Sequence, residues 1–207
     1  MTCSSKMSTA EAARLARFRV ETERFLEGGS SAAEYRAYRV PQGVYEQRRD
    51  GTYMLRVRCS GGRLGVAQLR ALALVSSRFG DGLLHVTTRQ DLQVHGVAAG
   101  DLPAAQEALS GGGLSTLGGG GNSVRNIAAC CDAGICADEA FDVTPFVEAL
   151  TARLLEDPAN LKLPRKFKVA FSGCARDCAG VAVNDVGAVA VLRDGRRGFE
   201  VFAGGGM

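Results

Sequence analysis

Long apolar segments are missing from this 207-residue sequence, and histidine is scarce. No run approaches the roughly 20 apolar residues that a membrane-spanning helix needs. The N-terminus lacks the apolar core and small-residue cleavage site of a secretory signal, so we expect a cytoplasmic protein. Two histidines argue against a histidine-rich metal site, and a net charge of +3 is too small to indicate nucleic-acid binding.

Cysteine, by contrast, is plentiful. In a reducing compartment, clustered cysteines indicate metal or redox chemistry rather than disulfides, and an odd number argues against a closed disulfide set. The seven cysteines are Cys3, Cys59, Cys130, Cys131, Cys136, Cys174 and Cys178. We expect Cys3 and Cys59 to be bystanders.

The first half of the chain predicts alternating helices and strands. Residues 8–27 predict a polar helix. Residues 53–59 alternate as a strand, residues 64–79 have the apolar spacing of a helix, and residues 84–97 predict a second strand. A strand, a helix and a strand with short connections are typical of an α/β unit.

A glycine-rich connector, GGGLSTLGGGGN, spans residues 111–122 and suggests a domain boundary. It matches neither glycine pattern of nucleotide-binding loops, so a flexible or closely packed turn is the better interpretation. Beyond it, Thr144 and Pro145 predict the N-cap and first turn of a helix that runs to about Glu156. Residues 166–171 then predict a strand.

The last residues predict a β-hairpin. Residues 189–193 and 199–203 alternate on either side of Asp194–Gly195, a dipeptide that favours tight hairpin turns. The sequence stops at residues 204–207, GGGM, where a turn should continue. We interpret this ending as truncation.

Four cysteines form two spaced pairs. Five residues separate Cys130 from Cys136, and three separate Cys174 from Cys178. Four thiolates on two loops are the ligand set of a [4Fe–4S] cluster. Structural zinc prefers tighter pairs, whereas inert buried cysteines are common in cores. Spacing alone does not decide between a cluster and inert cysteines, and the adjacent Cys131 leaves open which sulfur binds.

Polar and cationic side chains share faces on three of the predicted strands. By strand parity, they are Arg56 and Arg58 on the first, Thr87, Arg89, Gln93 and His95 on the second, and Lys166 and Lys168 on the third. Each face alone is most simply explained by solvation. Together they favour a shared anionic ligand, such as a polycarboxylate cofactor or a small oxyanion, because like charges without a counter-anion repel.

Several segments resemble the sirohaem- and [4Fe–4S]-dependent nitrite/sulfite reductases, from about Val40 to the C-terminus. The specific combination is RKFK shortly before C-x₃-C, together with RQ-x-x-Q-x-H and C-x₅-C. The similar segments are YMLRVRCSGGRL (53–64), HVTTRQDLQVHGV (85–97), SVRNI (123–127), LPRKFKVAFSGCARDC (163–178) and GFEVFAGGGM (198–207).

The resemblance implies an α/β (α+β) fold in which this chain is a truncated N-terminal repeat of a two-repeat enzyme. Residues 1–39 would form an N-terminal helical segment. Residues 40–110 would form a ferredoxin-like half-domain. Residues 111–207 would begin the sirohaem- and [4Fe–4S]-binding domain, incomplete at its C-terminus.

The resemblance also implies roles for the candidate residues. The cluster ligands would be Cys130, Cys136, Cys174 and Cys178, and Cys178 would also bridge to the sirohaem iron. The catalytic residues, which bind the substrate anion and supply protons, would be Arg56, Arg125, Lys166 and Lys168. The macrocycle would be held by Thr87, Arg89, Gln93 and His95, with Arg58 a weaker candidate.

The implied activity is the six-electron reduction of sulfite to sulfide or of nitrite to ammonia, since the same cationic pocket suits both anions. No flavin or nicotinamide signature is present, so we expect electrons from a ferredoxin or a partner subunit. A non-catalytic iron–sulfur electron-transfer or assembly module and an inactive truncated product are the alternatives. We expect no nucleic-acid or membrane partner.

The sequence departs from the family pattern in two ways. In the assimilatory enzymes, the RKFK and cysteine motifs belong to different halves of the chain. Here both occupy one repeat, as in single-repeat or dissimilatory-like members. The second half is also missing, so we expect another subunit or a separately encoded chain to complete the sirohaem site.

Overall fold

The computed structural model describes residues 8–205 and divides into two compact units. The first unit contains the chain up to Arg58 together with residues 64–87 and 92–120. The second contains residues 121 onward together with two short loops, residues 59–63 and 88–91. The three-part division at residues 39 and 110 stays a prediction, because compactness alone does not define family domains.

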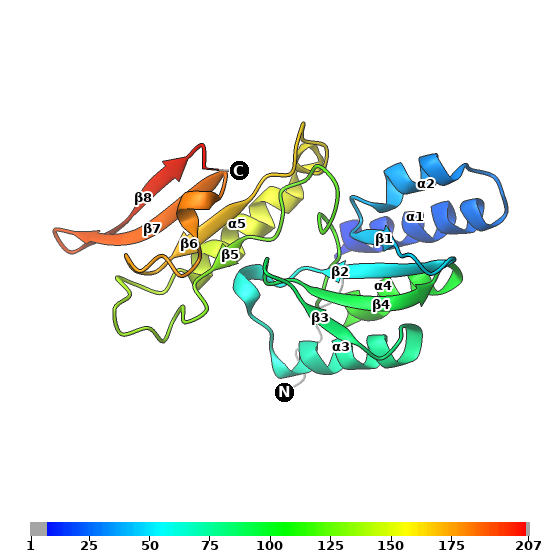
Figure 1. Ribbon diagram of the computed structural model, residues 1–207, viewed down its shortest axis with the longest axis horizontal. Helices are drawn as coiled ribbons and strands as arrows, with labels where there is room; N and C mark the ends of the chain where they lie inside the picture. Colours follow the sequence, from blue (N-terminus) through cyan, green and yellow to red (C-terminus); the bar gives the residue numbers. More distant parts are fainter. Residues whose placement is uncertain (1–7, 206–207) are drawn as a thin grey trace. The chain divides into compact units, whose positions relative to one another are not determined.

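Within its described residues, the first unit is a four-stranded antiparallel sheet with four α-helices (Figure 1). The strands, in the order β1-β2-β4-β3, are β1 (Val44–Glu46), β2 (Thr52–Val57), β3 (Leu84–Val86) and β4 (Leu92–Ala98). The helices are α1 (Thr9–Leu26), α2 (Ala32–Arg39), α3 (Val66–Phe79) and α4 (Leu102–Gly111). The predicted first helix is confirmed: the Ser8 hydroxyl accepts the Glu11 backbone N–H and so caps α1.

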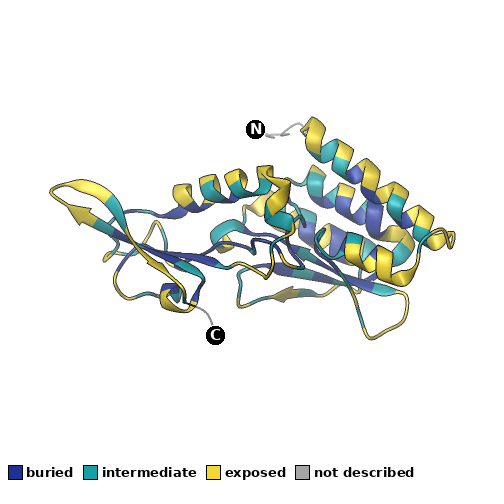
Figure 2. Cartoon of the chain, turned by 90° about the horizontal axis from the view of Figure 1, so that it is seen from above, coloured by how far each residue is buried: buried dark blue, intermediate teal, exposed yellow. Residues whose placement is uncertain are grey.

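Apolar side chains that alternate along β2 and recur at helical spacing in α3 form the core of this unit. Leu55 and Val57 are fully buried, as are Leu72 and Val75 on α3, which packs against β4. Figure 2 shows that the helices bury one face and expose the other. Burying each of these side chains contributes about 1.5–3 kcal/mol. No helix among the described residues is long and apolar enough to cross a membrane.

The predicted strand over residues 84–97 is wrong in one respect, because the structure divides it into the hairpin β3–β4. Residues 87–91 form the turn between them, and Gln90 has a left-handed φ of 59°. Thr87 and Arg89 therefore lie outside the strands, and strand parity does not apply to them. Only Gln93 and His95 share a strand face. All residues from 87 to 91 are polar, and polar residues are more favourable in a turn than in a half-buried strand.

The glycine-rich connector is closely packed within the first unit. Gly119 lies near the carbonyls of Arg56 and Thr116, where a Cβ would come within 2.7 Å and 2.9 Å of the two oxygens. A side chain at Gly120 would collide with the Val40 carbonyl. The backbone can pass at these two positions only without a Cβ, which explains Gly119 and Gly120, whereas a Cβ at Gly111 would meet no atom within 4 Å.

The second unit is a mixed sheet with the order β5-β6-β7-β8. Its elements are β5 (Ala128–Ala129), α5 (Thr144–Glu156), β6 (Val169–Ser172), β7 (Val186–Arg193) and β8 (Arg196–Ala203). The first three strands are parallel, and α5 links β5 to β6. Across both units, the described residues also include short 3₁₀ helices at Ser60–Gly62, Ala99–Asp101, Pro158–Leu161 and Val181–Val183.

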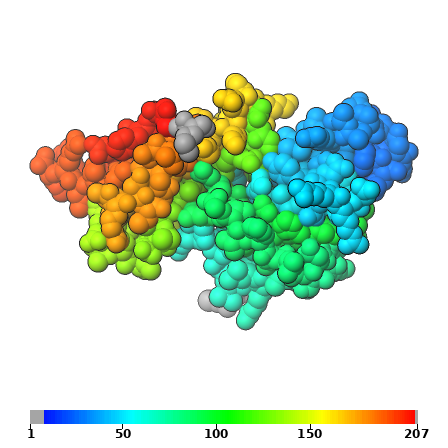
Figure 3. Space-filling view, viewed as in Figure 1, coloured from blue at the N-terminus to red at the C-terminus, as the bar shows by residue number. Residues whose placement is uncertain are grey.

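The predicted hairpin is confirmed as β7–β8. Asp194 and Gly195 both have positive φ, 51° and 72°, as a type I′ turn requires. Figure 3 shows this hairpin, coloured orange to red, at the surface. Most residues of β8 are exposed, including Val201 and Phe202.

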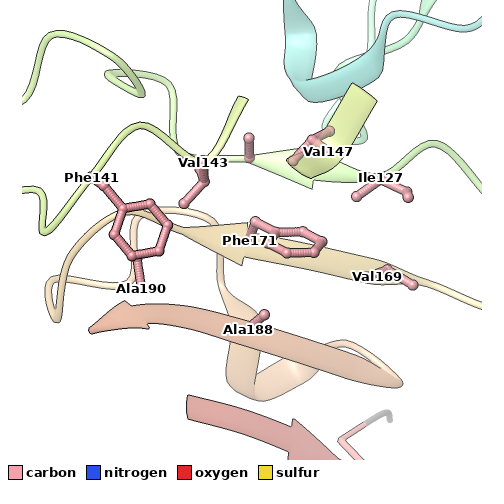
Figure 4. Close-up of a cluster of buried hydrophobic side chains, with 9 residues drawn as sticks. Ile127, Phe141, Val143, Val147, Val169, Phe171, Ala188 and Ala190 are labelled. Atoms are coloured by element: carbon pink, nitrogen blue, oxygen red, sulfur yellow. The ribbon is translucent and has the colours of Figure 1, made fainter. Parts of the chain in front are cut away.

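One face of the second sheet carries its main core. Val169 and Phe171 on β6, Ala188 on β7 and Val147 on α5 gather there (Figure 4). The Phe199 ring meets the Phe171 ring edge-on at 5.3 Å between centroids. This core fixes β5, β6 and α5, and therefore the loops that leave their ends.

Two local predictions in this unit need correction. The cap of α5 is Val143 rather than Thr144, because the Asp142 carboxylate accepts the Thr144 N–H at 2.9 Å. The strand predicted at residue 166 begins only at Val169. The Lys168 N–H donates to the Asp185 carboxylate at 2.7 Å instead of to a strand partner. Strand parity therefore does not place Lys166 and Lys168 on one face.

Candidate metal centre and anion-binding residues

Neighbouring strand ends present the four predicted cluster ligands. Cys130 follows β5 directly, and Cys174 lies two residues beyond the end of β6. Because β5 and β6 are parallel, their carboxyl ends lie at the same edge of the sheet. Cys136 and Cys178 continue the two loops that leave this edge.

A backbone hydrogen bond joins these two loops, from the Ala140 N–H to the Gly173 carbonyl at 2.8 Å. At the start of the first loop, the Cys130 N–H donates to the carbonyl of Phe171 on β6 at 3.1 Å. Gly173 leaves little room, since a Cβ would stand 3.1 Å from the Glu139 side chain. The carboxylate of Glu139 in turn accepts the N–H of Gly134 at 2.9 Å. The loops are thus tied together independently of any ligand.

The four thiols form two neighbouring pairs that cross between the loops. Cys130 interacts with Cys178, and Cys136 with Cys174. Burial raises the pKa of the Cys130 thiol to about 11, and Cys178 beside it adds to the rise. Hydrogen bonds from the backbone N–H and then the guanidinium of Arg176 hold the pKa of Cys174 below its usual value.

The donor set fits an iron–sulfur cluster. Within residues 8–205, no three Cys, His, Asp or Glu side chains converge closely enough to hold a single metal ion. A cubane has an iron at each of four corners, so its ligands stand farther apart than those of one ion. Four thiols on two joined loops meet that requirement. Of the other cysteines, Cys131 is exposed and Cys59 is buried, while Cys3 lies outside the described residues.

Two of the predicted anion-binding arginines lie close together in the second unit. Burial lowers the pKa of Arg89, and the neighbouring charge of Arg125 lowers it further, while Asp91 and Asp185 oppose the shift. Arg89 donates to the Asn184 side-chain oxygen at 2.7 Å. Two nearby guanidinium groups that are partly withdrawn from water suit an anionic ligand. Lys166 is exposed, and Lys168 is half-buried.

In the first unit, a chain of side-chain hydrogen bonds positions His95. The Gln47 amide oxygen accepts the Gly96 N–H at 2.7 Å, so its NH₂ group faces His95 Nδ1 at 2.9 Å. Nδ1 is then the acceptor, and Nε2 carries the proton toward the Gln93 oxygen at 3.1 Å. Gln47 was not predicted, because nothing in its local sequence marks it.

The remaining predicted residues of this unit are placed separately. Arg56 lies over the Tyr45 ring at 5.0 Å and donates to the Gly119 carbonyl at 3.0 Å. Arg58 is buried, and its backbone N–H donates to Ser115. Thr87 is half-buried at the end of β3. These contacts hold Arg56 and Arg58 against the connector.

Gln90 is a second residue that the sequence interpretation missed, although it lies within the RQ-x-x-Q-x-H motif. Its amide donates to the Ala129 carbonyl at 2.7 Å and accepts the Ala129 N–H at 2.9 Å. It therefore pairs with the free edge of β5 immediately before Cys130. Asn126 supports the same region by donating to the carbonyls of Cys59 and Arg89.

Two parallel strands that each lead into a loop with two cysteines, in a unit that also holds half-buried arginines, are typical of an iron–sulfur redox domain. Residues 120–207 match the model of the nitrite and sulphite reductase 4Fe-4S domain, and residues 45–111 match that of the nitrite/sulfite reductase ferredoxin-like half domain. The chain belongs to the nitrite/sulfite reductase family. The predicted fold class is confirmed, and the cofactors implied by the family are a [4Fe–4S] cluster and sirohaem.

Individual relatives agree with this assignment. A ferredoxin–nitrite reductase from Leptolyngbya laminosa is 36% identical over 160 residues, covering 75% of this chain and 31% of that protein. A ferredoxin sulfite reductase from Mycobacterium tuberculosis is 33% identical over 156 residues, covering 75% of this chain and 28% of that protein. The solved structure of the NirA protein of Mycobacterium tuberculosis matches with a TM-score of 0.78 at 30% identity, and the match covers 86% of this chain and 35% of that chain. The chain spans about a third of the length of these relatives.

Proposed function

We propose that this chain forms part of an enzyme that reduces nitrite to ammonia or sulfite to sulfide. The observation that carries the proposal is the presentation of four cysteines by the ends of β5 and β6. It is supported by matches to both domain models of one reductase family. Nitrite takes up six electrons and eight protons to give ammonium and two waters, so the site must supply protons as well as electrons.

The proposed cofactor ligands follow from this placement. Cys130, Cys136, Cys174 and Cys178 would ligate the cluster, and Cys178 would also reach the sirohaem iron. When bound, these two groups supply the electron chemistry. Sirohaem is a polycarboxylate, and its carboxylates would be held by Arg58, Thr87, Arg89, Gln93 and His95.

The catalytic roles rest on the different chemistry of arginine and lysine. Arg56 and Arg125 stay charged and would hold the substrate anion through fixed N–H groups. Lys166 and Lys168 would also bind the anion, and each could release a proton from Nζ as N–O or S–O bonds break. Cations in place before reaction stabilise the negative charge that develops on the substrate oxygens.

Electron supply and the rest of the cofactor site belong to the same proposal. The relatives from Leptolyngbya laminosa and Mycobacterium tuberculosis are named as ferredoxin enzymes, which supports a ferredoxin donor here, with a partner subunit as the other source. Because the chain spans about a third of such proteins, a second repeat or a second subunit would supply the remaining sirohaem contacts. A cytoplasmic location stays a prediction.

A second candidate function is a non-catalytic iron–sulfur electron-transfer or assembly module. The observation that favours it is that all four cysteines lie within the second unit, so a cluster needs no residue of the first. The two functions differ in their cofactors, because a module without sirohaem cannot carry out the six-electron reduction.

An anaerobic spectrum with iron and sulfide analysis tests the proposal in the chain expressed alongside sirohaem synthesis. We expect sirohaem bands and about four cluster irons plus one haem iron per chain. Cys178→Ser should abolish the signature of coupled cofactors, whereas the matched control Cys131→Ser should leave it unchanged. Iron and sulfide without sirohaem would favour the module, and normal spectra in Cys178→Ser would contradict the ligand assignment.

A further inference from the structure

Arg176 contacts predicted cluster ligands on both cysteine loops. It lies between Cys174 and Cys178 in sequence, but its Nη2 is 2.8 Å from Cys136 Sγ on the other loop. Its guanidinium also hydrogen-bonds the Cys174 thiol. A third contact places its Nε 3.6 Å from the Asp138 carboxylate. One side chain thus joins the two loops at the sulfur atoms themselves.

The chemistry of guanidinium makes these contacts directional. Arginine has five N–H donors and no acceptor, and it stays charged in proteins. A hydrogen bond between Arg176 and a cysteine sulfur must therefore run from N–H to sulfur. Hydrogen bonds to the sulfurs and the nearby net charge are among the features that set the potential of an iron–sulfur cluster.

We propose that Arg176 is a positioning residue that donates to the Cys136 and Cys174 sulfurs and raises the reduction potential of the cluster that they ligate. The inference rests on the proposed cluster site but not on the substrate. Reduction adds one negative charge to the cluster, and a cation nearby stabilises the reduced form more than the oxidised form. The Arg176 side chain is 56% exposed, so water screens its charge and the effect is moderate.

Substitutions of Arg176 separate its charge from its hydrogen bonds. Arg176→Gln keeps an N–H donor but removes the charge, and Arg176→Lys keeps the charge without the planar fork. The control is Arg153→Gln in α5 of the same unit, since Arg153 is exposed and pairs only with Glu156 among the ion pairs of the described residues. All chains would be purified anaerobically and their iron and sulfide measured before a redox titration followed by electron paramagnetic resonance.

We expect Arg176→Gln to change the ratio of oxidised to reduced cluster about tenfold toward the oxidised form at fixed potential. This corresponds to a midpoint about 59 mV lower for a one-electron couple. Arg176→Lys should give a smaller shift, and Arg153→Gln none. A loaded Gln variant with the parental midpoint would overturn the proposal, as would an equal shift in the Arg153 control.

Hydrogen exchange in the cluster-free chain gives a readout that does not depend on cluster loading. If Arg176 ties the loops, amides of residues 131–140 should exchange several-fold faster in Arg176→Gln than in the parent or in Arg153→Gln. Unchanged exchange would reject the tie between the loops. A parent chain that takes up no cluster would instead contradict the proposed function, and the exchange result would still decide whether Arg176 positions these loops.

Discussion

The two units hold their polar side chains in different ways. In the first unit, Gln93 and His95 stand on the regular strand β4, and side-chain amides orient them. In the second unit, Cys130 and Cys174 stand beyond strand ends, where individual hydrogen bonds hold them, from Cys130 N–H to the Phe171 carbonyl and from the Ser172 hydroxyl to the Cys174 carbonyl. Strand periodicity fixes the direction of a side chain, whereas a loop residue depends on its individual contacts. We therefore expect single substitutions to have larger effects in the second unit.

The largest effect is expected for Lys168→Ala, which removes a proposed catalytic cation. The Lys168 backbone is held by Asp185, so the fold should not need its side chain. We expect both cofactors to stay bound and kcat to fall by about 10²-fold, the usual cost of removing one stabilising donor. Spectra and turnover of nitrite and sulfite with an artificial reductant, in the chain together with the second repeat or subunit that completes its site, would measure both effects.

Lys162→Ala is the matched control for this substitution, because Lys162 is exposed in the same unit and has no proposed role. Its rate should stay at the parental value. A full rate in Lys168→Ala would remove Lys168 from the substrate pocket. Loss of sirohaem from that variant would instead show that Lys168 holds the cofactor.

Gln90→Ala should have the next largest effect, because it opens the strand edge beside Cys130. Without the Gln90 amide, the backbone N–H and C=O of Ala129 both lose their hydrogen-bond partner. Water cannot easily replace it, because Ala129 is only 1% exposed. We expect the free energy of unfolding to fall by about 2 kcal/mol and cluster content to fall with it. Urea denaturation and iron analysis would measure the two changes.

Gln68→Ala gives a control with the same chemistry at the surface of the first unit. Gln68 also makes one accepted and one donated bond to backbone, with Gly65 and Gly113, but both bonds are exposed. Water can replace them, so the cost should stay near 0.5 kcal/mol. Equal costs for Gln68→Ala and Gln90→Ala would contradict the proposed difference between the units.

The sequence predicted elements best where periodicity and turn chemistry agreed. The helix α1 and the turn at Asp194–Gly195 follow from such local signals, and α5 follows from the Thr144–Pro145 pair although its cap lies one residue earlier. The hairpin β3–β4 did not, because the apolar alternation of Leu84 and Val86 resumes in the same phase at Leu92 after the polar turn, and the positive φ of Gln90 has no sequence signature. The short strand β5 was also missed, since two alanines carry no pattern.

The candidate site could be predicted as a set of residues but not as an arrangement. Spacing grouped Cys130 with Cys136 and Cys174 with Cys178, whereas the neighbouring thiols in the structure pair across the loops. That crossing depends on the parallel pairing of β5 with β6, which is a long-range contact. Gln47, Gln90 and Arg176 act through contacts with residues distant in sequence or on another loop, so only the fold reveals them.

The smallest effect is expected for Gln47→Leu, which tests whether the first unit tolerates loss of an orienting amide. The substitution leaves the Gly96 N–H and His95 Nδ1 without Gln47, and we expect a cost of about 1 kcal/mol in the free energy of unfolding. Long-range ¹⁵N–¹H spectra of the imidazole should show the proton on Nε2 in the parent and a mixture of tautomers in the variant. In Gln68→Leu, the His95 spectrum should stay parental. If Gln47→Leu kept the Nε2 proton alone, β4 and Gln93 would suffice to orient His95, and the first unit would need even fewer individual contacts than we infer.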